Sequence, residues 1–391
     1  MNNTAIIVIT YNRLDSLKRL LNSLQNAIYP ECIPLIISVD KSDTSLVEEF
    51  SNNFIWNHGE KIVDKHQHNM GLKAHILSLG KWFAKYDSLI ILEDDLEVSP
   101  AFFYYCSETI SQYQINSDIA GVSLYSFSVN YINHMPFTPA YNGYDVYMMN
   151  CAMSWGQIWF KEQWNDFINW YTKHEDFSYT PDIPHNLFNW GKNSWLKYHT
   201  RYCIETNKYF VYPYFSFVTN NSDIGTHNSA QDGNLFQVIR ASQYNGKLRL
   251  PLTIEDSVVY DGFFERKNII KYLDLPDNET CIDLNATKYL EPWRYVLTTR
   301  KLNYKIIKTF GLKYKPIEDN VIYYSRGDDI FLYDTSISLK NSNNQRLIRI
   351  YQYHFQIEAI PIFIHRIGEV RILIDYISFC FNQFKKWLRI S

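Results

Sequence analysis

The chain has 391 residues, of which 46% are hydrophobic and 20% charged, so it can bury a sizeable core and is not a disordered chain. The net charge of −3 does not imply general electrostatic binding of nucleic acid, and we expect no nucleic-acid partner. Six scattered cysteines without a CxxC pair predict reduced thiols rather than a zinc or redox motif. We see no signal-peptide pattern and no apolar run of the about 18–20 residues that span a bilayer, and therefore expect a cytoplasmic protein.

Apolar runs and helical spacings alternate along the first 125 residues. This βαβα order predicts an α/β fold, a doubly wound and mainly parallel sheet with right-handed crossovers. No GxGxxG or GxxxxGK[ST] pattern follows a strand, so neither a dinucleotide fold nor a P-loop is supported. We expect strands at residues 5–10, 34–40, 61–64, 88–92 and 119–124. We expect a first helix with Asp15 as its N-cap, and further helices at residues 46–54, 70–86 and 102–113.

Three adjacent carboxylates, Glu93, Asp94 and Asp95, follow the apolar strand at residues 88–92. Ligands of open α/β sheets bind beyond the carboxyl ends of the strands. Unpaired charges are costly in a core, and Mg²⁺ and Mn²⁺ prefer oxygen ligands. The triplet therefore predicts a divalent-cation site, with a solvated acidic loop as the alternative. Asp40 ends an earlier strand, where its carboxylate can accept hydrogen bonds from a base or ribose.

Four landmarks, ITYNR, SVD, HNMGL and LEDDLEVSP, stand in order at predicted strand ends and helix starts. Together they resemble nucleotide-sugar glycosyltransferases with the GT-A fold, the family 2-like bacterial type. The stretch EDDLEVSPAFF is similar to the acidic motif of N-acetylglucosaminyltransferase I. The resemblance covers about residues 4–230. It implies a GT-A (Rossmann-like) fold, and beyond it we expect a C-terminal accessory region.

The resemblance also implies a nucleotide-sugar site with Mn²⁺ or Mg²⁺. Each implied role has a plainer alternative: Asn12 and Gly71 are also typical turn residues, and Lys73 is also typical of a solvated helix surface. The segment around Trp155 could equally pack in the core, and His227 could simply be an exposed loop residue. The metal ligands implied are Asp95 and His227. The nucleotide-sugar residues implied are Thr10, Tyr11, Asn12, Arg13, Asp40, Asn69, Gly71, Leu72, Lys73, Glu93, Asp94, Ser154, Trp155 and Gly156.

The position of the general base departs from the family. Many relatives have an aspartate directly before a tryptophan, where it removes the acceptor proton in an inverting transfer. Here Asn193 and Ser194 precede Trp195, and neither side chain is a carboxylate. Asp182 is the first substitute, with a missing base as the alternative. The further acidic candidates nearby are Glu175, Asp176 and Glu205.

The remaining organisation is predicted as follows. Residues 1–250 form the transferase domain, with a nucleotide half at 1–125 and an acceptor half at 126–250, which contains a strand at 214–218. Residues 251–365 form an accessory region. Residues 366–391 combine an apolar helix face with basic residues, which is typical of a peripheral helix on the cytoplasmic face of the inner membrane. A terminal helix docked on the protein is the alternative.

We therefore expect a metal-dependent, inverting hexosyl- or N-acetylhexosaminyltransferase that uses a UDP-sugar. The expected acceptor is a hydroxyl of a bacterial surface glycan, such as a lipid-linked precursor of capsule or lipopolysaccharide. Two rivals remain. A sugar nucleotidyltransferase would need a glycine-rich basic loop after the first strand, and ITYNRLDSL has no glycine. A glycan-binding or scaffold protein on a transferase fold is favoured by the missing aspartate and disfavoured by the intact triplet.

Overall fold

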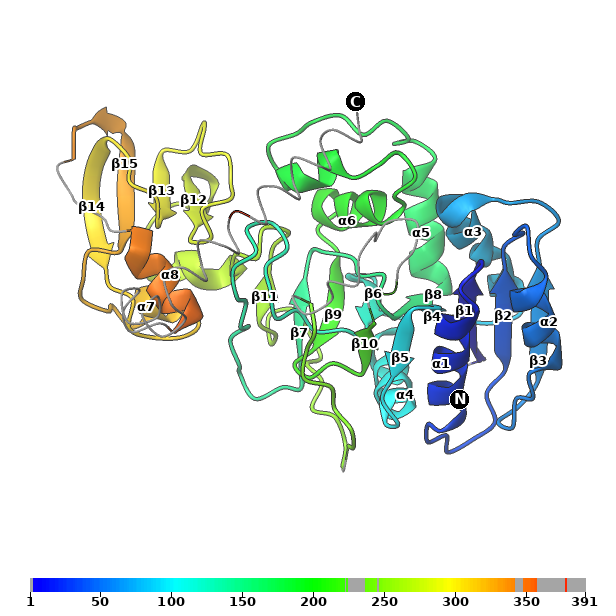
Figure 1. The fold of residues 1–391 in the computed structure, drawn as a ribbon. Coiled ribbons are helices and arrows are strands. Elements are labelled where there is room, and N and C mark those ends of the chain that lie inside the picture. Colours follow the sequence, from blue (N-terminus) through cyan, green and yellow to red (C-terminus); the bar gives the residue numbers. More distant parts are fainter. Residues whose placement is uncertain are drawn as a thin grey trace.

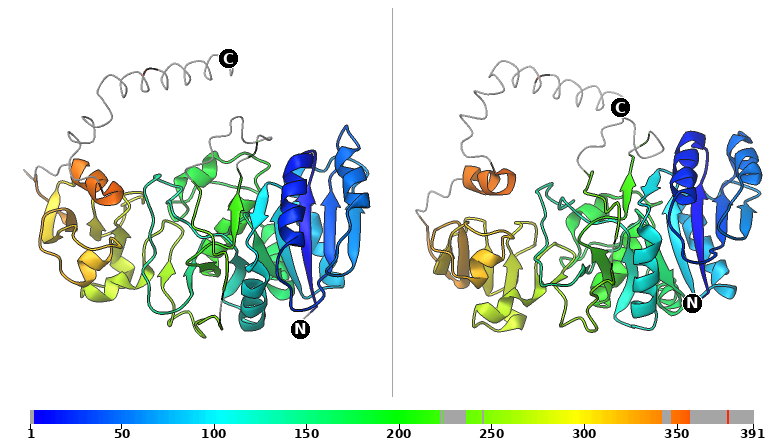
Figure 2. Two further views of the ribbon diagram at one scale, coloured as in Figure 1. Left: turned by 60° about the horizontal axis from the view of Figure 1, so that its bottom comes forward. Right: turned by 90° about the horizontal axis from the view of Figure 1, so that it is seen from below.

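The computed structural model describes residues 3–221, 223, 236–244, 246–341, 347–356 and 377. Within these residues, the chain forms a larger α/β unit and a smaller C-terminal sheet that lies beyond one end of it (Figures 1 and 2). No helix in this part of the chain is long and apolar enough to cross a bilayer. The predicted terminal helix at residues 366–391 lies outside the described residues, apart from residue 377.

A nine-stranded sheet is the centre of the larger unit, as far as the described residues show. Its strand order is β11-β7-β9-β6-β8-β4-β1-β2-β3. The strands are β1 (Thr4–Thr10), β2 (Leu35–Val39), β3 (Lys61–Lys65), β4 (Ser88–Glu93), β6 (Ile119–Ser123), β7 (Val146–Met149), β8 (Gln157–Phe160), β9 (Tyr209–Pro213) and β11 (Val259–Tyr260).

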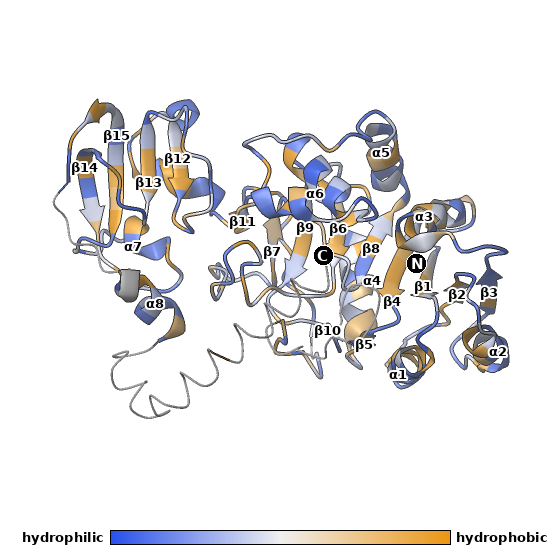
Figure 3. Ribbon diagram, turned by 45° about the horizontal axis from the view of Figure 1, so that its top comes forward, coloured by the Kyte–Doolittle hydropathy of each residue, from blue (hydrophilic) through white to orange (hydrophobic). Residues whose placement is uncertain are grey.

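The predicted α/β class and mainly parallel sheet are confirmed. β1 runs parallel to both β2 and β4, β2 runs parallel to β3, and β6 runs parallel to β9. β1 and β4 are buried along nearly their whole length and appear hydrophobic in Figure 3, as expected for strands covered on both faces. The antiparallel strand β8, inserted between β4 and β6, was not predicted.

The helices begin close to the predicted positions, with two corrections. Asp15 is not the N-cap of α1: Arg13 holds that position, and Asp15 lies in the first turn. The helix predicted at residues 70–86 begins at Gly71 and changes to a 3₁₀ helix after Ser78. Gly80 in the 3₁₀ helix packs directly against Trp164, where a Cβ would lie 2.4 Å from the indole Nε1. The helices are α1 (Leu14–Gln25), α2 (Leu46–Asn53), α3 (Gly71–Ser78), η1 (Leu79–Ala84), α4 (Phe102–Tyr113), α5 (Lys161–Tyr171), η2 (His185–Asn189) and α6 (Leu196–Glu205).

The strand predicted at residues 214–218 is wrong. β9 ends at Pro213, which has no N–H to continue a ladder. The chain then turns, and β10 (Val218–Asn220) pairs antiparallel with β5 (Leu96–Val98). This small second sheet lies directly after the acidic triplet. It therefore brings the segment around residue 220 to the edge where the triplet lies.

The main sheet runs past the predicted boundary at residue 250, because β11 pairs in parallel with β7. A four-stranded sheet in the order β12-β13-β15-β14 follows, within the predicted accessory region. Its own apolar core is separate from that of the larger unit. The remaining elements are η3 (Lys267–Tyr272), η4 (Asp277–Glu279), β12 (Thr280–Asp283), β13 (Tyr295–Thr298), β14 (Tyr304–Phe310), α7 (Asp319–Ile322), β15 (Ile330–Ser338) and α8 (Leu347–Phe355).

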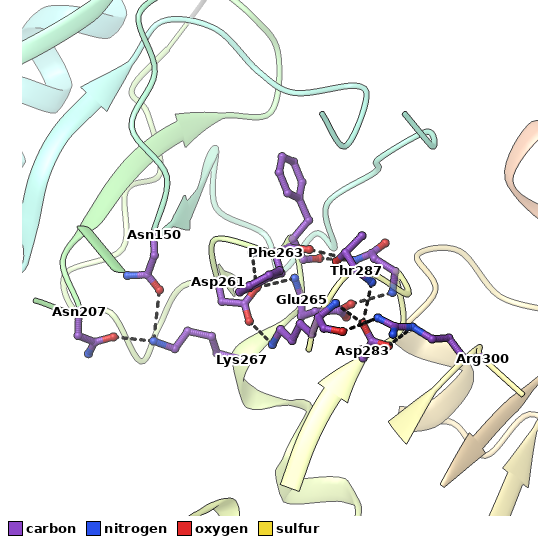
Figure 4. Close-up of polar contacts among 12 residues, drawn as sticks. Asn150, Asn207, Asp261, Phe263, Glu265, Lys267, Asp283, Thr287 and Arg300 are labelled. Carbon is purple, nitrogen blue, oxygen red and sulfur yellow. Dashed lines mark hydrogen bonds and ion pairs between the residues drawn. The ribbon is translucent and has the colours of Figure 1, made fainter. Parts of the chain in front are cut away.

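A buried polar network joins the end of β11 to the end of β12 (Figure 4). Asp261 accepts a hydrogen bond from the backbone N–H of Glu265 at 2.9 Å and pairs with the Lys288 ammonium at 2.5 Å. Asp283 accepts the backbone N–H of Lys288 at 2.8 Å and pairs with Arg300 at 3.0 Å. Lys288 thus bonds both aspartates. The network fixes the C-terminal sheet to the larger unit through paired charges. Loss of one partner would leave the other charge unpaired in the junction, which is costly.

Candidate active site

The carboxyl ends of β1 and β4 lie side by side, because the two strands are parallel neighbours with Ile9 opposite Glu93. Thr10 Oγ1 donates a hydrogen bond to Asp94 Oδ2 at 2.9 Å. Arg13, at the start of α1, pairs with Asp95 Oδ2 at 3.0 Å and with Asp94 Oδ1. The first landmark and the acidic triplet therefore meet at one edge of the sheet, as parallel pairing requires.

Burial shapes the charge of this cluster. Asp94 is only 2% exposed, and burial raises its pKa to about 6 although the Arg13 guanidinium opposes the shift. Burial also raises the pKa of Glu93 to about 8, with the charges of Asp95 and Asp94 adding to the effect. Burial therefore favours the protonated form of both acids, and the neighbouring carboxylates add to this effect at Glu93.

One oxygen of the cluster is left without a partner. Asp95 Oδ1 is buried, and none of the described residues donates a hydrogen bond to it. A buried carboxylate oxygen of this kind suits a hard cation. In the described part of the chain, however, no three His, Cys, Asp or Glu side chains gather with metal-ligand geometry. Any cation would therefore need further ligands, such as water, phosphate oxygens or a side chain outside the described residues.

Asp40 ends β2 and fixes the start of α3. Its Oδ1 accepts the backbone N–H groups of Lys41 and Met70, both at 2.9 Å, and its Oδ2 accepts that of Gly71 at 3.0 Å. Gly71 has φ +73°, a conformation that favours glycine, and it also donates to Asn69 Oδ1 at 2.9 Å. A carboxylate has about four acceptor positions. Asp40 therefore keeps about one for a ligand and uses the others to hold the helix start.

The segment between β7 and β8 reaches the same acidic cluster. The Ser154 hydroxyl is hydrogen-bonded to Glu93. The Trp155 ring packs edge-on against Tyr125, with centroids 4.9 Å apart, and stays partly exposed. Gly156 has φ +77° and would place a Cβ 3.1 Å from Leu124. A third stretch of the chain thus joins β1 and β4 at this edge.

Residues 5–152 match the family model of glycosyl transferase family 2. The match covers less than half of the chain, and this part is thus similar to family 2 glycosyltransferases. The recognition made from the four landmarks is thereby confirmed.

Solved structures similar to the chain share little sequence with it. Among them are residues 1–349 of S. aureus TarS in complex with UDP (14% identity, 55% of this chain and 59% of that chain, TM-score 0.37) and GalNAc-T7 with UDP, GalNAc and Mn²⁺ (13%, 56% and 44%, TM-score 0.38). A third is the mannosyltransferase PcManGT from Pyrobaculum calidifontis with GDP-Man and Mn²⁺ (10%, 54% and 56%, TM-score 0.34). The chain thus spans 44 to 59% of the length of these three structures. No curated protein matches it.

The other residues predicted to bind the nucleotide lie around this edge of the nine-stranded sheet. Tyr11 is half-buried and Asn12 is exposed in the loop between β1 and α1. Leu72 packs partly buried against the core. Lys73 is half-buried, and its ammonium lies 4.3 Å from the ring centroid of Tyr198 on α6. Aromatic contact therefore replaces the fully solvated position that was the alternative for this lysine.

The residues proposed for the base lie elsewhere. Asp182 and Asn193 are both exposed in the segment between α5 and α6. The Lys73 contact with Tyr198 joins α3 to α6, the helix that follows this segment. None of the contacts described for either residue joins it to the acidic triplet. His227 lies outside the described residues.

Sequence reasoning missed two features of the site. Asp223, which was not among the expected site residues, accepts a hydrogen bond from Ser16 Oγ at 2.7 Å and pairs with Arg19 of α1. Arg13 was expected to line the nucleotide pocket but not to pair with the triplet. Both contacts join residues more than 80 positions apart, and no local pattern marks them. The spacing of Arg13, Ser16 and Arg19 on one helix face was the only signal available.

Proposed function

We propose that this protein transfers a sugar from a nucleotide-sugar, a UDP-sugar first, to a hydroxyl of a glycan. One observation carries the proposal: in the part of the chain that is similar to family 2 glycosyltransferases, Asp94 and Asp95 at the end of β4 lie against Thr10 and Arg13 at the end of β1. Acidic and basic groups at adjacent strand ends suit a ligand that bears both hydroxyls and phosphates.

The donor half of the site divides into three parts. Residues 10–13 and Asp40 would flank the nucleoside, and the segment at the start of α3, residues 69–73, would lie near the ribose and phosphates. Ser154 and Glu93 lie where sugar hydroxyls would be held. Asp95 Oδ1 would ligate Mn²⁺ or Mg²⁺, with His227 as a second proposed ligand. When bound, such a cation neutralises the charge that develops on the leaving diphosphate.

The acceptor half includes Trp155, whose partly exposed ring offers a flat apolar face to a sugar. An inverting transfer needs a base that removes the acceptor hydroxyl proton. Asn193 cannot do so, and we assign this role to Asp182. The segment that carries Asp182 would have to move toward the triplet when donor and acceptor bind. The acceptor class we propose is a bacterial surface glycan. A lipid-linked precursor would be reached through the basic, apolar residues 366–391.

A transfer assay tests the proposal directly. Purified protein with Mn²⁺ is given UDP-glucose, UDP-galactose and their N-acetylated forms, and the release of UDP is followed over time. We expect release from one donor, and we expect Asp95→Asn to lower the rate by about 100-fold, since the variant loses a charge next to the leaving group. Arg240→Gln is the matched control, since it removes a charge that pairs with Glu97 rather than with the triplet. Failure to release any nucleotide from UDP-, GDP- or CDP-sugars would count against a transferase.

A glycan-binding protein without catalysis is the second candidate. The specific observation that favours it is Asn193-Ser194 in place of the carboxylate expected before Trp195. Such a protein would bind nucleotide weakly or not at all. If no donor turns over but polysaccharide still quenches the fluorescence of the wild type and not of Trp155→Phe, this second function replaces the first.

A further inference from the structure

Arg13 holds the two aspartates of the triplet from a fixed point. Its backbone is set by the first turn of α1, where its C=O accepts the N–H of Leu17 at 3.0 Å. Its guanidinium donates to Asp95 Oδ2 at 3.0 Å and to Asp94 Oδ1. Thr10 takes the other oxygen of Asp94. Among the described residues, Arg13 is thus the cationic side chain paired with Asp94 and Asp95. Of the four carboxylate oxygens of these two aspartates, Asp95 Oδ1 alone accepts no hydrogen bond from a described residue.

This arrangement has an electrostatic consequence for a second cation. A divalent ion at Asp95 Oδ1 would lie close to a guanidinium that already bonds the other oxygen of the same carboxylate. Like charges a few ångström apart in a partly buried site repel strongly. Metal and guanidinium therefore compete for the same negative charge.

We propose that Arg13 keeps free divalent cations off Asp94 and Asp95 and releases the pair only when a nucleoside diphosphate arrives. The inference rests on the proposed donor site and assigns an order to it. The Arg13 side chain is 25% exposed, so its fork can turn toward solvent. A diphosphate offers the guanidinium more negative charge than the aspartates do, in a geometry that suits bidentate binding. Nucleotide binding then frees Asp95 for the cation.

The proposal predicts strong coupling between nucleotide and metal. Linkage requires that UDP tighten Mn²⁺ binding by the same factor by which Mn²⁺ tightens UDP binding. If Arg13 carries this coupling, its removal must act mainly on the nucleotide-free protein. The free protein should then bind Mn²⁺ without waiting for UDP.

Electron paramagnetic resonance of free Mn²⁺ measures this without any turnover. The titration uses nucleotide-free wild type, Arg13→Gln, Arg13→Lys and the control Arg240→Gln. We expect Arg13→Gln to bind Mn²⁺ about tenfold or more tightly than wild type. Arg13→Lys keeps the charge but cannot bond both aspartates, and should be intermediate. Arg240→Gln removes the same charge from Glu97 and should match wild type.

Two results would overturn the proposal. One is an equal Mn²⁺ affinity of wild type and Arg13→Gln without nucleotide. The other is a gain in Mn²⁺ affinity in Arg240→Gln as large as that in Arg13→Gln. Asp95→Asn in the Arg13→Gln background checks the location of the ion, because it should abolish the gain. Thermal unfolding confirms that each variant is folded. Failure of the donor function would show separately, as absence of UDP binding to wild type, while the nucleotide-free comparison would still decide the role of Arg13.

Discussion

Asp40→Asn separates the structural role of this aspartate from its role in binding. The carboxylate accepts three backbone N–H groups, two on Oδ1 and one on Oδ2. In either orientation, the NH₂ of asparagine faces at least one of these donors. A hydrogen bond to a charged group contributes about 1.5–3 kcal/mol. The charge at the helix start contributes about 0.3–1 kcal/mol more. We therefore expect Asp40→Asn to lower the free energy of unfolding by about 2–4 kcal/mol.

Urea unfolding followed by circular dichroism measures the change, with a parallel UDP titration on the folded variant. Asp43→Asn is the matched control, because it makes the same substitution at an exposed loop position close by. It should stay within about 0.5 kcal/mol of wild type. The reasoning would be refuted if Asp40→Asn were as stable as Asp43→Asn while UDP binding was lost, because the carboxylate would then serve the ligand and not the helix.

Three further predictions concern other parts of the molecule. Burial raises the pKa of Glu265 from its usual 4.5 to about 8, so the folded state holds this proton more tightly, and wild-type stability should fall as pH rises from about 5 to 8. Glu265→Gln should flatten that pH dependence in urea unfolding series, and an unchanged slope would contradict it. Lys73→Met should lower the free energy of unfolding by about 0.5–1 kcal/mol, because it loses the contact of the ammonium with the Tyr198 ring. Chemical denaturation at low and high salt measures this, and unchanged stability would contradict it. Asp182→Asn should lower kcat about 100-fold or more at unchanged UDP affinity, whereas an unaltered kcat would exclude it as the base and make Asn193→Asp the next variant to assay.

The nucleotide half was predictable because its signals are local. The apolar runs of β1, β2 and β4 indicate buried strands, and parallel pairing then places their carboxyl ends together. Chemistry at those ends, Thr10 and the triplet, could be predicted before any coordinates. The meeting of Arg13 with Asp94 and Asp95 could not, because the pairing depends on where a side chain at the start of α1 turns.

The prediction failed where the structure depends on contacts distant in sequence. β8 enters the sheet antiparallel between β4 and β6, and β10 pairs with β5, which lies over a hundred positions earlier. An apolar stretch at 214–218 looked like a strand in isolation, but Pro213 ends the ladder before it. The C-terminal sheet followed no family pattern. Its attachment through Asp261 and Lys288 is a buried charge network that composition does not reveal.

The most direct test of the donor site is a calorimetric titration of UDP into wild type and Asp95→Asn, each with and without Mn²⁺, followed by GDP and CDP. The account predicts that UDP binds wild type with Mn²⁺ much more tightly than without it, and that Asp95→Asn abolishes the effect of the metal. Absence of binding by any of the three nucleotides, or UDP binding that ignores both Mn²⁺ and Asp95, would contradict it.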